Sequence, residues 1–558
     1  MTRFERRHLD ESRANAGPVA NTLIDEFAQG EMDRGDFIRR ASVLGLSLPL
    51  VGAALAGLGA APLAASASTH AAKAGGRLRL GIVGAPAGAI DPHLFNNHGH
   101  VVVGGITGEY LIRGRQRTPL VPELALKWTP NATASKWTYS LRPNVKFQTG
   151  KVMNADDVVA TYMRLTDPKG GSQALSAFGG VLSPEGIRKI DDLTVEFALD
   201  APNANFPYLT SSTTYQAVIL PADYQIGTFT TTPQTTGAFK LTALTPGVSI
   251  KYDRFDGWWG GTAPLDGVDA TIFDEDGAAA VAAMLAGSQD LLSQMSLTAG
   301  RPLIKNPNIK MFTARGASHR TIGMHVDKDP FKDFRVRQAL ALSIDRPALL
   351  KTVLGGFGDI GNDSPFAPLY ASTSKSVPQR HKDLKKAKQL LTAAGHADGF
   401  SATLTSINYL EVPQLAQIFQ ASLKKIDVNL KLKMQPASVY YGGNAKTTPW
   451  LNAPMNLTDW GHRAVPNVVA NSSLTSKGVW NGSHYASKKF DRLLKSYVGA
   501  ISLADQRKYS KQLQELLLHD TPVIYPYFNG WLMPGSPKLK GFEASPDAQT
   551  YLSKASLA

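Results

Sequence analysis

Two adjacent carboxylates, Asp156 and Asp157, form the pair whose type and spacing most directly suggest chemistry. Neighbouring carboxylates can act as general acid and base or bind a divalent cation. Here they follow Asn154 and precede an apolar run, the pattern of a helix with a capping residue and negative charge at its positive end. We therefore expect a structural helix start and neither a catalytic dyad nor a metal site.

Arg337 and Asp345 form a second pair with catalytic potential, within residues 330–346, PFKDFRVRQALALSIDR. Apolar residues recur at helical spacing through this segment, and Asp333 stands where it can cap the helix. We predict that Arg337 and Asp345 serve as an ion pair and a cap within a packed helix.

The remaining reactive residue types form no recognisable catalytic pattern. The sequence contains no H-E-x-x-H, no phosphate-binding P-loop and no G-x-S-x-G. Its 12 histidines are dispersed without metal-ligand spacing, and it has no cysteine, which excludes disulfides, thiolate metal sites and a cysteine nucleophile. We expect no catalytic residue, no metal and no cofactor.

Composition sets the class of protein. A chain of 558 residues is too long for one hydrophobic core, so two or more lobes are expected. The hydrophobic content of 43% and charged content of 19% are those of a globular protein. The net charge is +14, but the basic residues are scattered and no Lys/Arg run of five occurs, so nucleic-acid binding is not indicated.

The elements that position any site are organised around residues 233–261, PQTTGAFKLTALTPGVSIKYDRFDGWWGG. Apolar and polar residues alternate on both sides of Thr245-Pro246-Gly247, where Pro presets φ and Gly accepts a positive φ. This pattern predicts a β-hairpin followed by an aromatic, glycine-rich loop.

The same stretch resembles extracytoplasmic substrate-binding proteins of ABC importers, the large dipeptide, oligopeptide and nickel type (family 5). The shared text is T-G-[PA]-[FY]-K-L, a P-G turn and a W-G-G ending. Residues 330–346 match a second long segment, and residues 385–434 match a third with alternating helices and strands. The resemblance covers the chain from about Gly76 to the C-terminus.

The resemblance implies an α/β fold of two lobes, the large class II periplasmic-binding-protein type. The first lobe would comprise residues 76–115, 229–315 and 530–558, with an inserted subdomain of residues 116–228, and the second lobe residues 316–529. Two strands would cross between the lobes. It also implies a periplasmic, monomeric protein that captures a small solute by hinge closure and delivers it to the transmembrane permease subunits. The alternatives are a ligand sensor that feeds a signalling partner, or a secreted enzyme.

Ligand-binding residues are expected in the cleft between the lobes. The first lobe would contribute Phe95 and Asn96 from the loop after the D-P turn. The second lobe would contribute Asn408 and Tyr409 from a strand end, Trp460 and Arg463 from another, and also His325, Trp480 and Tyr485.

Arg463 marks a departure from the peptide-binding members. In those proteins a strand ends in Trp-Gly and is followed by an aspartate that pairs with the free amine of the peptide. Here Arg463 stands at about that position, and a cation repels an ammonium group. The guanidinium group of Arg463 can bind a carboxylate or phosphate through two parallel hydrogen bonds. The alternative is a structural arginine paired to a neighbouring residue.

The N-terminus has the pattern of an export signal. Arg39-Arg40 precede an uncharged stretch, residues 41–69, that is rich in Ala, Gly and Leu and ends in small residues. This resembles a twin-arginine signal cleaved near Ala65-Ser66-Ala67, although Val43-Leu44 replaces the usual Phe-Leu. A transmembrane helix is the alternative. We expect residues 1–70 to lie outside the fold, and the lack of cysteine predicts no lipid anchor.

Overall fold

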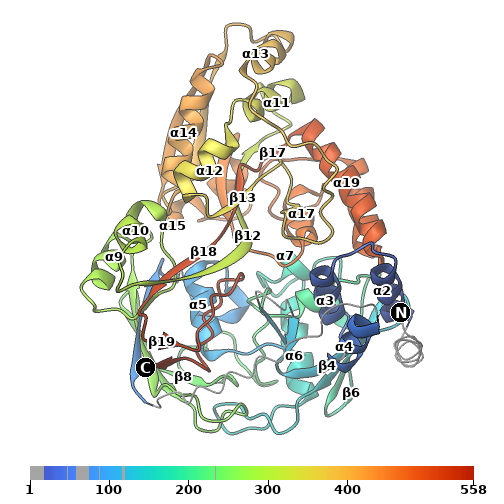
Figure 1. Cartoon of the computed structure of the whole chain (residues 1–558), viewed down its shortest axis with the longest axis vertical. Coiled ribbons are helices and arrows are strands. Elements are labelled where there is room, and N and C mark those ends of the chain that lie inside the picture. Colours follow the sequence, from blue (N-terminus) through green and yellow to red (C-terminus); the bar gives the residue numbers. More distant parts are fainter. Residues whose placement is uncertain (1–17, 47, 58–74, 87, 116–119, 233) are drawn as a thin grey trace.

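One twisted sheet runs through both lobes of the molecule (Figure 1). The computed structural model describes residues 18–46, 48–57, 75–86, 88–115, 120–232 and 234–558. In this part the strand order of the main sheet is β15-β14-β16-β12-β18-β11-β1-β10-β9-β8. The protein is therefore the expected two-lobed α/β fold; the residue boundaries given above for its lobes stay a prediction.

The lower lobe in Figure 1 holds one half of this sheet. Its strands are β1 (Arg77–Val83), β8 (Phe239–Thr245), β9 (Ser249–Arg254), β10 (Gly267–Phe273) and β11 (Leu291–Leu292). Strand β1 pairs in parallel with β10 and β11. Its helices are α5 (His98–Thr107), α9 (Ala278–Leu285) and α10 (Leu297–Ile304).

The predicted hairpin is confirmed as β8 and β9. The two strands pair antiparallel, and Gly247 in the turn between them has a φ of +70°. The indole N–H groups of Trp258 and Trp259, which follow the hairpin, donate to the buried carboxylate of Glu109 at 2.9 and 2.7 Å. The tryptophans therefore fasten the hairpin to the segment after α5.

The upper lobe holds the other half of the sheet. Its strands are β14 (Phe400–Ile407), β15 (Val428–Gln435) and β16 (Met455–Trp460), with β14 parallel to both neighbours. Its longer helices are α11 (Phe334–Leu342), α12 (Arg346–Leu354), α13 (Leu384–Ala393), α14 (Val412–Lys424), α17 (Pro466–Leu474), α18 (Lys488–Gly499) and α19 (Leu503–Asp520). The short helices α15 (Ala437–Tyr440) and α16 (Pro449–Asn452) precede β16 in the chain.

Two strands cross between the lobes, β12 (Lys310–Met324) and β18 (Tyr527–Gly535). They pair antiparallel on both sides of an irregularity between Ala314 and Ser318, where the register shifts. Beyond it β12 continues into the upper lobe against β16 and β17 (Val523–Ile524), and β13 (Gly358–Ile360) adds to β18. A prediction of two crossings is confirmed, but β12 begins ten residues before the strand expected at Arg320.

A separate sheet of order β4-β5-β7-β6 lies beside the lower lobe. Its strands are β4 (Ala125–Pro130), β5 (Lys136–Leu141), β6 (Ile187–Asp191) and β7 (Thr194–Ala198), covered by α6 (Ala155–Thr166). The predicted cap of α6 is confirmed: Asn154 and Asp157 form a capping box, and Asp157 pairs with Lys151 at 2.7 Å. The carboxylate pair is structural.

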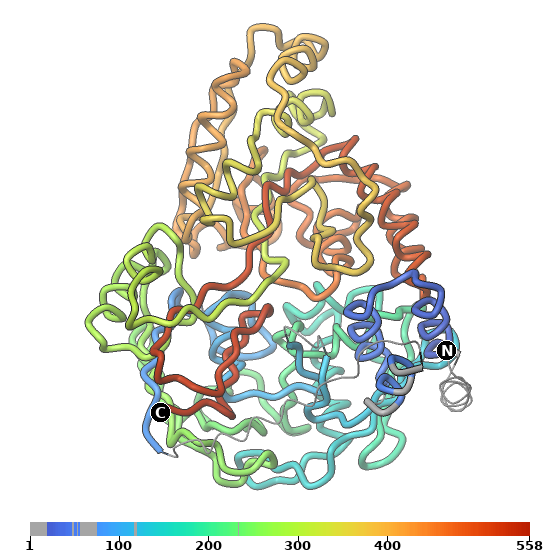
Figure 2. The backbone as a smooth tube through the Cα atoms, in the orientation of Figure 1, coloured from blue at the N-terminus to red at the C-terminus, as the bar shows by residue number. Residues whose placement is uncertain are grey.

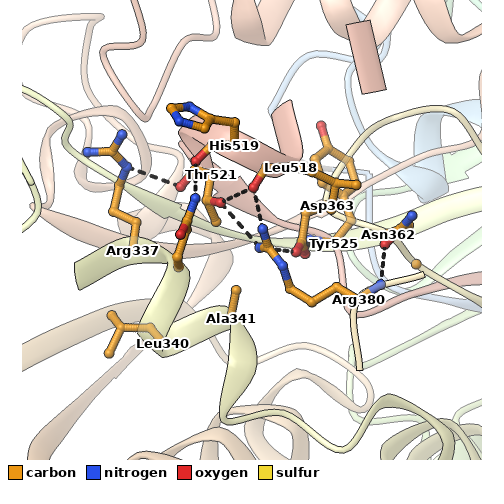
Figure 3. Close-up of polar contacts among 12 residues, drawn as sticks. Arg337, Leu340, Ala341, Asn362, Asp363, Arg380, Leu518, His519, Thr521 and Tyr525 are labelled. Carbon is orange, nitrogen blue, oxygen red and sulfur yellow. Dashed lines mark hydrogen bonds and ion pairs between the residues drawn. The ribbon is translucent and has the colours of Figure 1, made fainter. Parts of the chain in front are cut away.

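The prediction of a cap at Asp345 is confirmed, but the prediction of an ion pair for Arg337 needs correction (Figure 3). Arg337 forms no ion pair among the described residues; its guanidinium donates to backbone carbonyl groups, including those of Asp520 at 2.5 Å and Thr521 at 3.2 Å. Asp345 caps α12 through the N–H of Ala348 and pairs with Lys382. Backbone carbonyl groups at the C-terminal end of α19 thus take the place of the expected carboxylate. The last carbonyl groups of a helix have no partner within the helix, so they need donors from elsewhere.

The described part of residues 1–70 is packed against the fold. Helices α2 (Pro18–Ala28), α3 (Arg34–Val43) and α4 (Leu48–Gly57) lie beside α19 and the separate sheet (Figures 1 and 2). Phe37 is fully buried, the indole of Trp128 donates to the Val43 carbonyl at 2.7 Å, and Arg40 donates to Gln506 at 2.8 Å. Helices α2 and α3 thus bury apolar faces against the fold, and the assignment of residues 1–70 to an export signal stays a prediction.

The expected cleavage point at Ala65-Ser66-Ala67 lies outside the described residues. Every helix in the described ranges is too short or too polar to cross a membrane.

Candidate functional site

A cavity of about 960 Å³ lies between the lobes. The lower lobe contributes Gly84 and Ala85 after β1 and residues 294–297 after β11; the upper lobe contributes residues 409–411 after β14 and residues 460–463 after β16. These are carboxyl ends of parallel strands, where open α/β sheets bind ligands. The crossing strands β12 and β18 form the floor, with Ala314 to Gly316 and Gly530 to Leu532.

Aromatic rings of the upper lobe cover one side of the cavity. Trp450 of α16, Trp460 at the end of β16 and Trp480 in the loop after α17 lie with ring centroids 5.9 to 6.3 Å apart. We call these three the tryptophan wall. Thr321 of β12 orients one ring by accepting the Trp460 indole N–H at 2.9 Å. Such a surface favours a flat or apolar part of a solute.

Arg463 lies at the cavity and reaches the other side of the cleft. Its guanidinium donates to the carbonyl of His462 at 3.1 Å and to the hydroxyl of Tyr215 at 3.2 Å, and lies 5.0 Å from the Tyr215 ring centroid. All these partners are neutral, and no carboxylate pairs with Arg463 in the part of the chain that the structure describes. Its positive charge therefore remains available to an anion.

Acidic side chains also line the cavity, among them Glu275 from the lower lobe and Asp459 from the upper. Partial burial, and then the negative charges of Asp459 and Asp274, raise the pKa of Glu275 above its ordinary value. Asp459 accepts a hydrogen bond from the Tyr441 hydroxyl. The cavity thus presents both signs of charge.

Arg320 and Glu411, which also line the cavity, form a buried ion pair with a nitrogen–oxygen distance of 2.9 Å. Both side chains are about 5% exposed or less. The Glu411 carboxylate also accepts from the Tyr527 hydroxyl at 3.1 Å. The carboxylate thus has two partners, whereas the buried Nε of Arg320 has no hydrogen-bond partner among the described residues. We assign the pair to positioning the loop that carries Tyr409.

The lobes are in direct contact across the cavity. The side chains of Gln294 and Tyr409 form reciprocal hydrogen bonds at 2.9 and 3.2 Å. Thr298 donates to Gln414 at 3.1 Å beside them. Together with Arg463 and Tyr215, these contacts hold the cleft closed.

Five of the nine residues expected at the ligand site line the cavity: Asn96, Tyr409, Trp460, Arg463 and Trp480. The other four do not line it. Phe95 is fully buried and stacks on His100, with a centroid distance of 5.2 Å. Asn408 is exposed on the opposite side from Tyr409, as neighbouring residues of an extended segment are.

His325 and Tyr485 are the remaining two, and both are buried behind the wall. His325 bonds the Leu451 carbonyl at 3.2 Å, and the Tyr485 hydroxyl donates to Asp520 at 2.5 Å. The four side chains Phe95, Asn408, His325 and Tyr485 therefore lie outside the cavity lining.

Sequence reasoning missed several cavity residues, among them Tyr215, Glu275, Gln294, Trp450 and Asp459. Asp459 adjoins Trp460 in the stretch already singled out, so it could have been found there. Gln294 follows the strand after residues 284–290 and carried no signal of its own.

Comparison with known proteins identifies the family. Residues 119–482 match the description of bacterial extracellular solute-binding proteins, family 5 (middle region). The chain belongs to this family. As a family 5 solute-binding protein it captures a solute outside the cytoplasm and delivers it to the permease of an ABC importer.

Relatives of this family 5 protein differ in the ligand that their names give. Heme-binding protein A of Haemophilus influenzae is 26% identical over 457 residues, which cover 77% of this chain and 82% of the relative. The glutathione-binding protein GsiB of Escherichia coli is 26% identical over 442 residues, covering 76% and 83%. A periplasmic binding protein DppA from Helicobacter pylori, solved with the peptide STSA, has a TM-score of 0.76 at 23% identity, covering 87% of this chain and 98% of that one.

Proposed function

We propose that this family 5 protein binds a solute with a carboxylate or phosphate group and a flat or apolar portion. The observation that carries the proposal is Arg463, a cation at the cavity whose partners among the described residues are all neutral. The tryptophan wall would hold the apolar portion. A cationic group on the same solute would find its counter-charge at Glu275 and Asp459, so a dipolar, peptide-like compound also fits.

The first test identifies what the protein carries. We would purify it gently and analyse the bound compound by mass spectrometry. A compound with a carboxylate or phosphate supports the proposal, and a compound with no anionic group contradicts it.

The second test compares Arg463→Ala with Arg315→Ala for the compound so identified. Arg315 also lines the cavity but already pairs with Asp359 at 2.6 Å. Loss of charged hydrogen bonds of about 1.5–3 kcal/mol predicts roughly 10- to 150-fold weaker binding for Arg463→Ala and a small change for Arg315→Ala. Equal effects would mean that Arg463 makes no special contact with the anion.

We infer that the protein has no catalytic role. His98 at the cavity lies 3.0 Å from the hydroxyl of Ser293, an arrangement that resembles a nucleophile and base. Ser293, however, is 1% exposed, does not line the cavity and accepts the Val83 N–H. Burial lowers the pKa of His98 to about 3, which makes it a poor base at neutral pH. The bound compound should therefore be recovered unchanged after incubation.

We further propose that the protein acts as a monomer and is exported by the twin-arginine route. The supporting feature is Arg39-Arg40 before the uncharged stretch. In the fold Arg40 is bonded to Gln506 and to the Ile501 carbonyl, so the export machinery would have to read α3 in an undocked state. Replacing both arginines by lysine should leave the precursor in the cytoplasm, whereas normal export would contradict this route. Light scattering on the purified protein tests the monomer.

A further inference from the structure

Three potential metal ligands meet behind the tryptophan wall: His325, Asp327 and His484. The last lies 157 residues from Asp327 in sequence, which is why spacing predicted no metal site. Just after β12 ends, the N–H of Val326 donates to the Ser483 carbonyl at 2.9 Å and brings the two segments side by side. One ligand atom from each of the three side chains then lies within 4.8 Å of the others.

His325 is the fixed member of the group. It is fully buried, and its Nε2 lies 3.2 Å from the Leu451 carbonyl, which requires the ring proton on Nε2. The lone pair therefore sits on Nδ1, which is buried and has no hydrogen-bond partner among the described residues. Metal-binding histidines commonly donate the other N–H to a carbonyl in this way, and an orphaned buried acceptor is otherwise costly.

The ring of His484 stacks on that of His325 with centroids 3.7 Å apart, and its Nδ1 lies 3.1 Å from the Asp327 carboxylate.

The other two potential ligands, Asp327 and His484, are accessible to solvent and can change rotamer. The side chains of Asp327 and His484 are 52% and 36% exposed, so an ion can enter and both can rotate. The backbone of His484 is held at a φ of +55°, a conformation uncommon outside glycine and enriched at functional sites. Asn481 stabilises this turn by two hydrogen bonds with Tyr485, at 2.8 and 3.1 Å.

We propose that His325, Asp327 and His484 bind one divalent transition-metal ion of the Zn²⁺ type, with water completing the coordination. Two imidazoles and a carboxylate suit Zn²⁺, and its bonds of about 2.0–2.1 Å place tetrahedral ligand atoms about 3.3 Å apart. The exposed side chains would close the remaining distance. The ion would tie the end of β12 to the loop that carries Trp480, and so stiffen the tryptophan wall from outside the cavity.

The test is calorimetric titration of the chelator-treated full chain with Zn²⁺, repeated with Co²⁺ to follow its visible absorption. We expect one equivalent to bind. His484→Gln and Asp327→Asn are exposed changes that should not disturb folding, and each should weaken binding by about 100-fold or more, whereas the exposed His381→Gln should not. Circular dichroism verifies that the variants fold.

Three outcomes would overturn the proposal: binding weaker than millimolar, an unchanged affinity in the double variant Asp327→Asn/His484→Gln, or a loss of affinity in His381→Gln equal to that in His484→Gln. The result is independent of the solute proposal, because the three ligands lie outside the cavity lining.

Discussion

Removing the hydroxyl of Tyr409 should open the cleft. The Tyr409→Phe variant loses the two reciprocal hydrogen bonds to Gln294 that join the lobes. One Gln294 amide N–H still donates to the Val83 carbonyl at 2.9 Å, but in the closed form the other N–H and the amide oxygen lose their partner. Each hydrogen bond contributes about 1 kcal/mol net, and the loss of about 1–2 kcal/mol lowers the closed-to-open ratio roughly 5- to 30-fold.

The absence of cysteine makes this measurable by spin-label distance spectroscopy. Lys305→Cys in the lower lobe and Lys424→Cys in the upper place labels at exposed sites on either side of the cleft. Without solute, Tyr409→Phe should shift the distance distribution towards longer values. The matched control is Tyr441→Phe, which also removes a hydroxyl at the cavity, but one that bonds Asp459 within the same lobe. An unchanged distribution in Tyr409→Phe, or an equal shift in both variants, would refute the reasoning.

Three further changes test the scaffold. A Cβ at Gly530 would lie 2.0 Å from the Ala314 carbonyl oxygen, so Gly530→Ala should lower the free energy of unfolding in urea by about 1–3 kcal/mol. An unchanged free energy of unfolding would show that β12 and β18 can separate freely at this point. Asp363→Asn leaves the buried Arg346 without its carboxylate and should cost about 3–5 kcal/mol, whereas a cost below about 1 kcal/mol would show that water reaches the pair. Burial, and then the charge of Glu123, raise the pKa of Glu109 to about 7. Between about pH 4.5 and 7 the folded state therefore binds a proton that the unfolded state has lost, so the stability of the protein falls as pH rises through this range. The Glu109→Gln variant should flatten this part of a plot of melting temperature against pH. A slope identical to that of the unchanged protein would contradict the assignment.

Local patterns in the sequence predicted the fold well. The alternation around Thr245-Pro246-Gly247 and the capping pattern at Asn154 depend on neighbours in the chain, and both are confirmed. The N-terminal helices show the limit of this reasoning. A polar, mixed-charge composition and an adjacent arginine pair indicated an export signal, but they did not show that Phe37 and Arg40 find partners far along the chain.

The site was predicted less completely, for a related reason. Strand ends located Tyr409, Trp460 and Arg463 because ligand sites in α/β folds lie there. The contacts that define the cavity join residues more than a hundred positions apart, such as Gln294 with Tyr409. No periodicity connects such residues, and side-chain direction decided which neighbour of each strand end faces the cavity.

The irregularity in β12 has a mechanical consequence. The strand pair is regular on either side of residues 315–317, so rotation of one lobe against the other is easiest at this joint. Arg315 and Gly316 at the joint also belong to the floor of the cavity. A solute bound on the floor of the cavity therefore contacts the joint directly. Binding of the solute can then be coupled to movement of the lobes without a structural change passing through the body of either lobe.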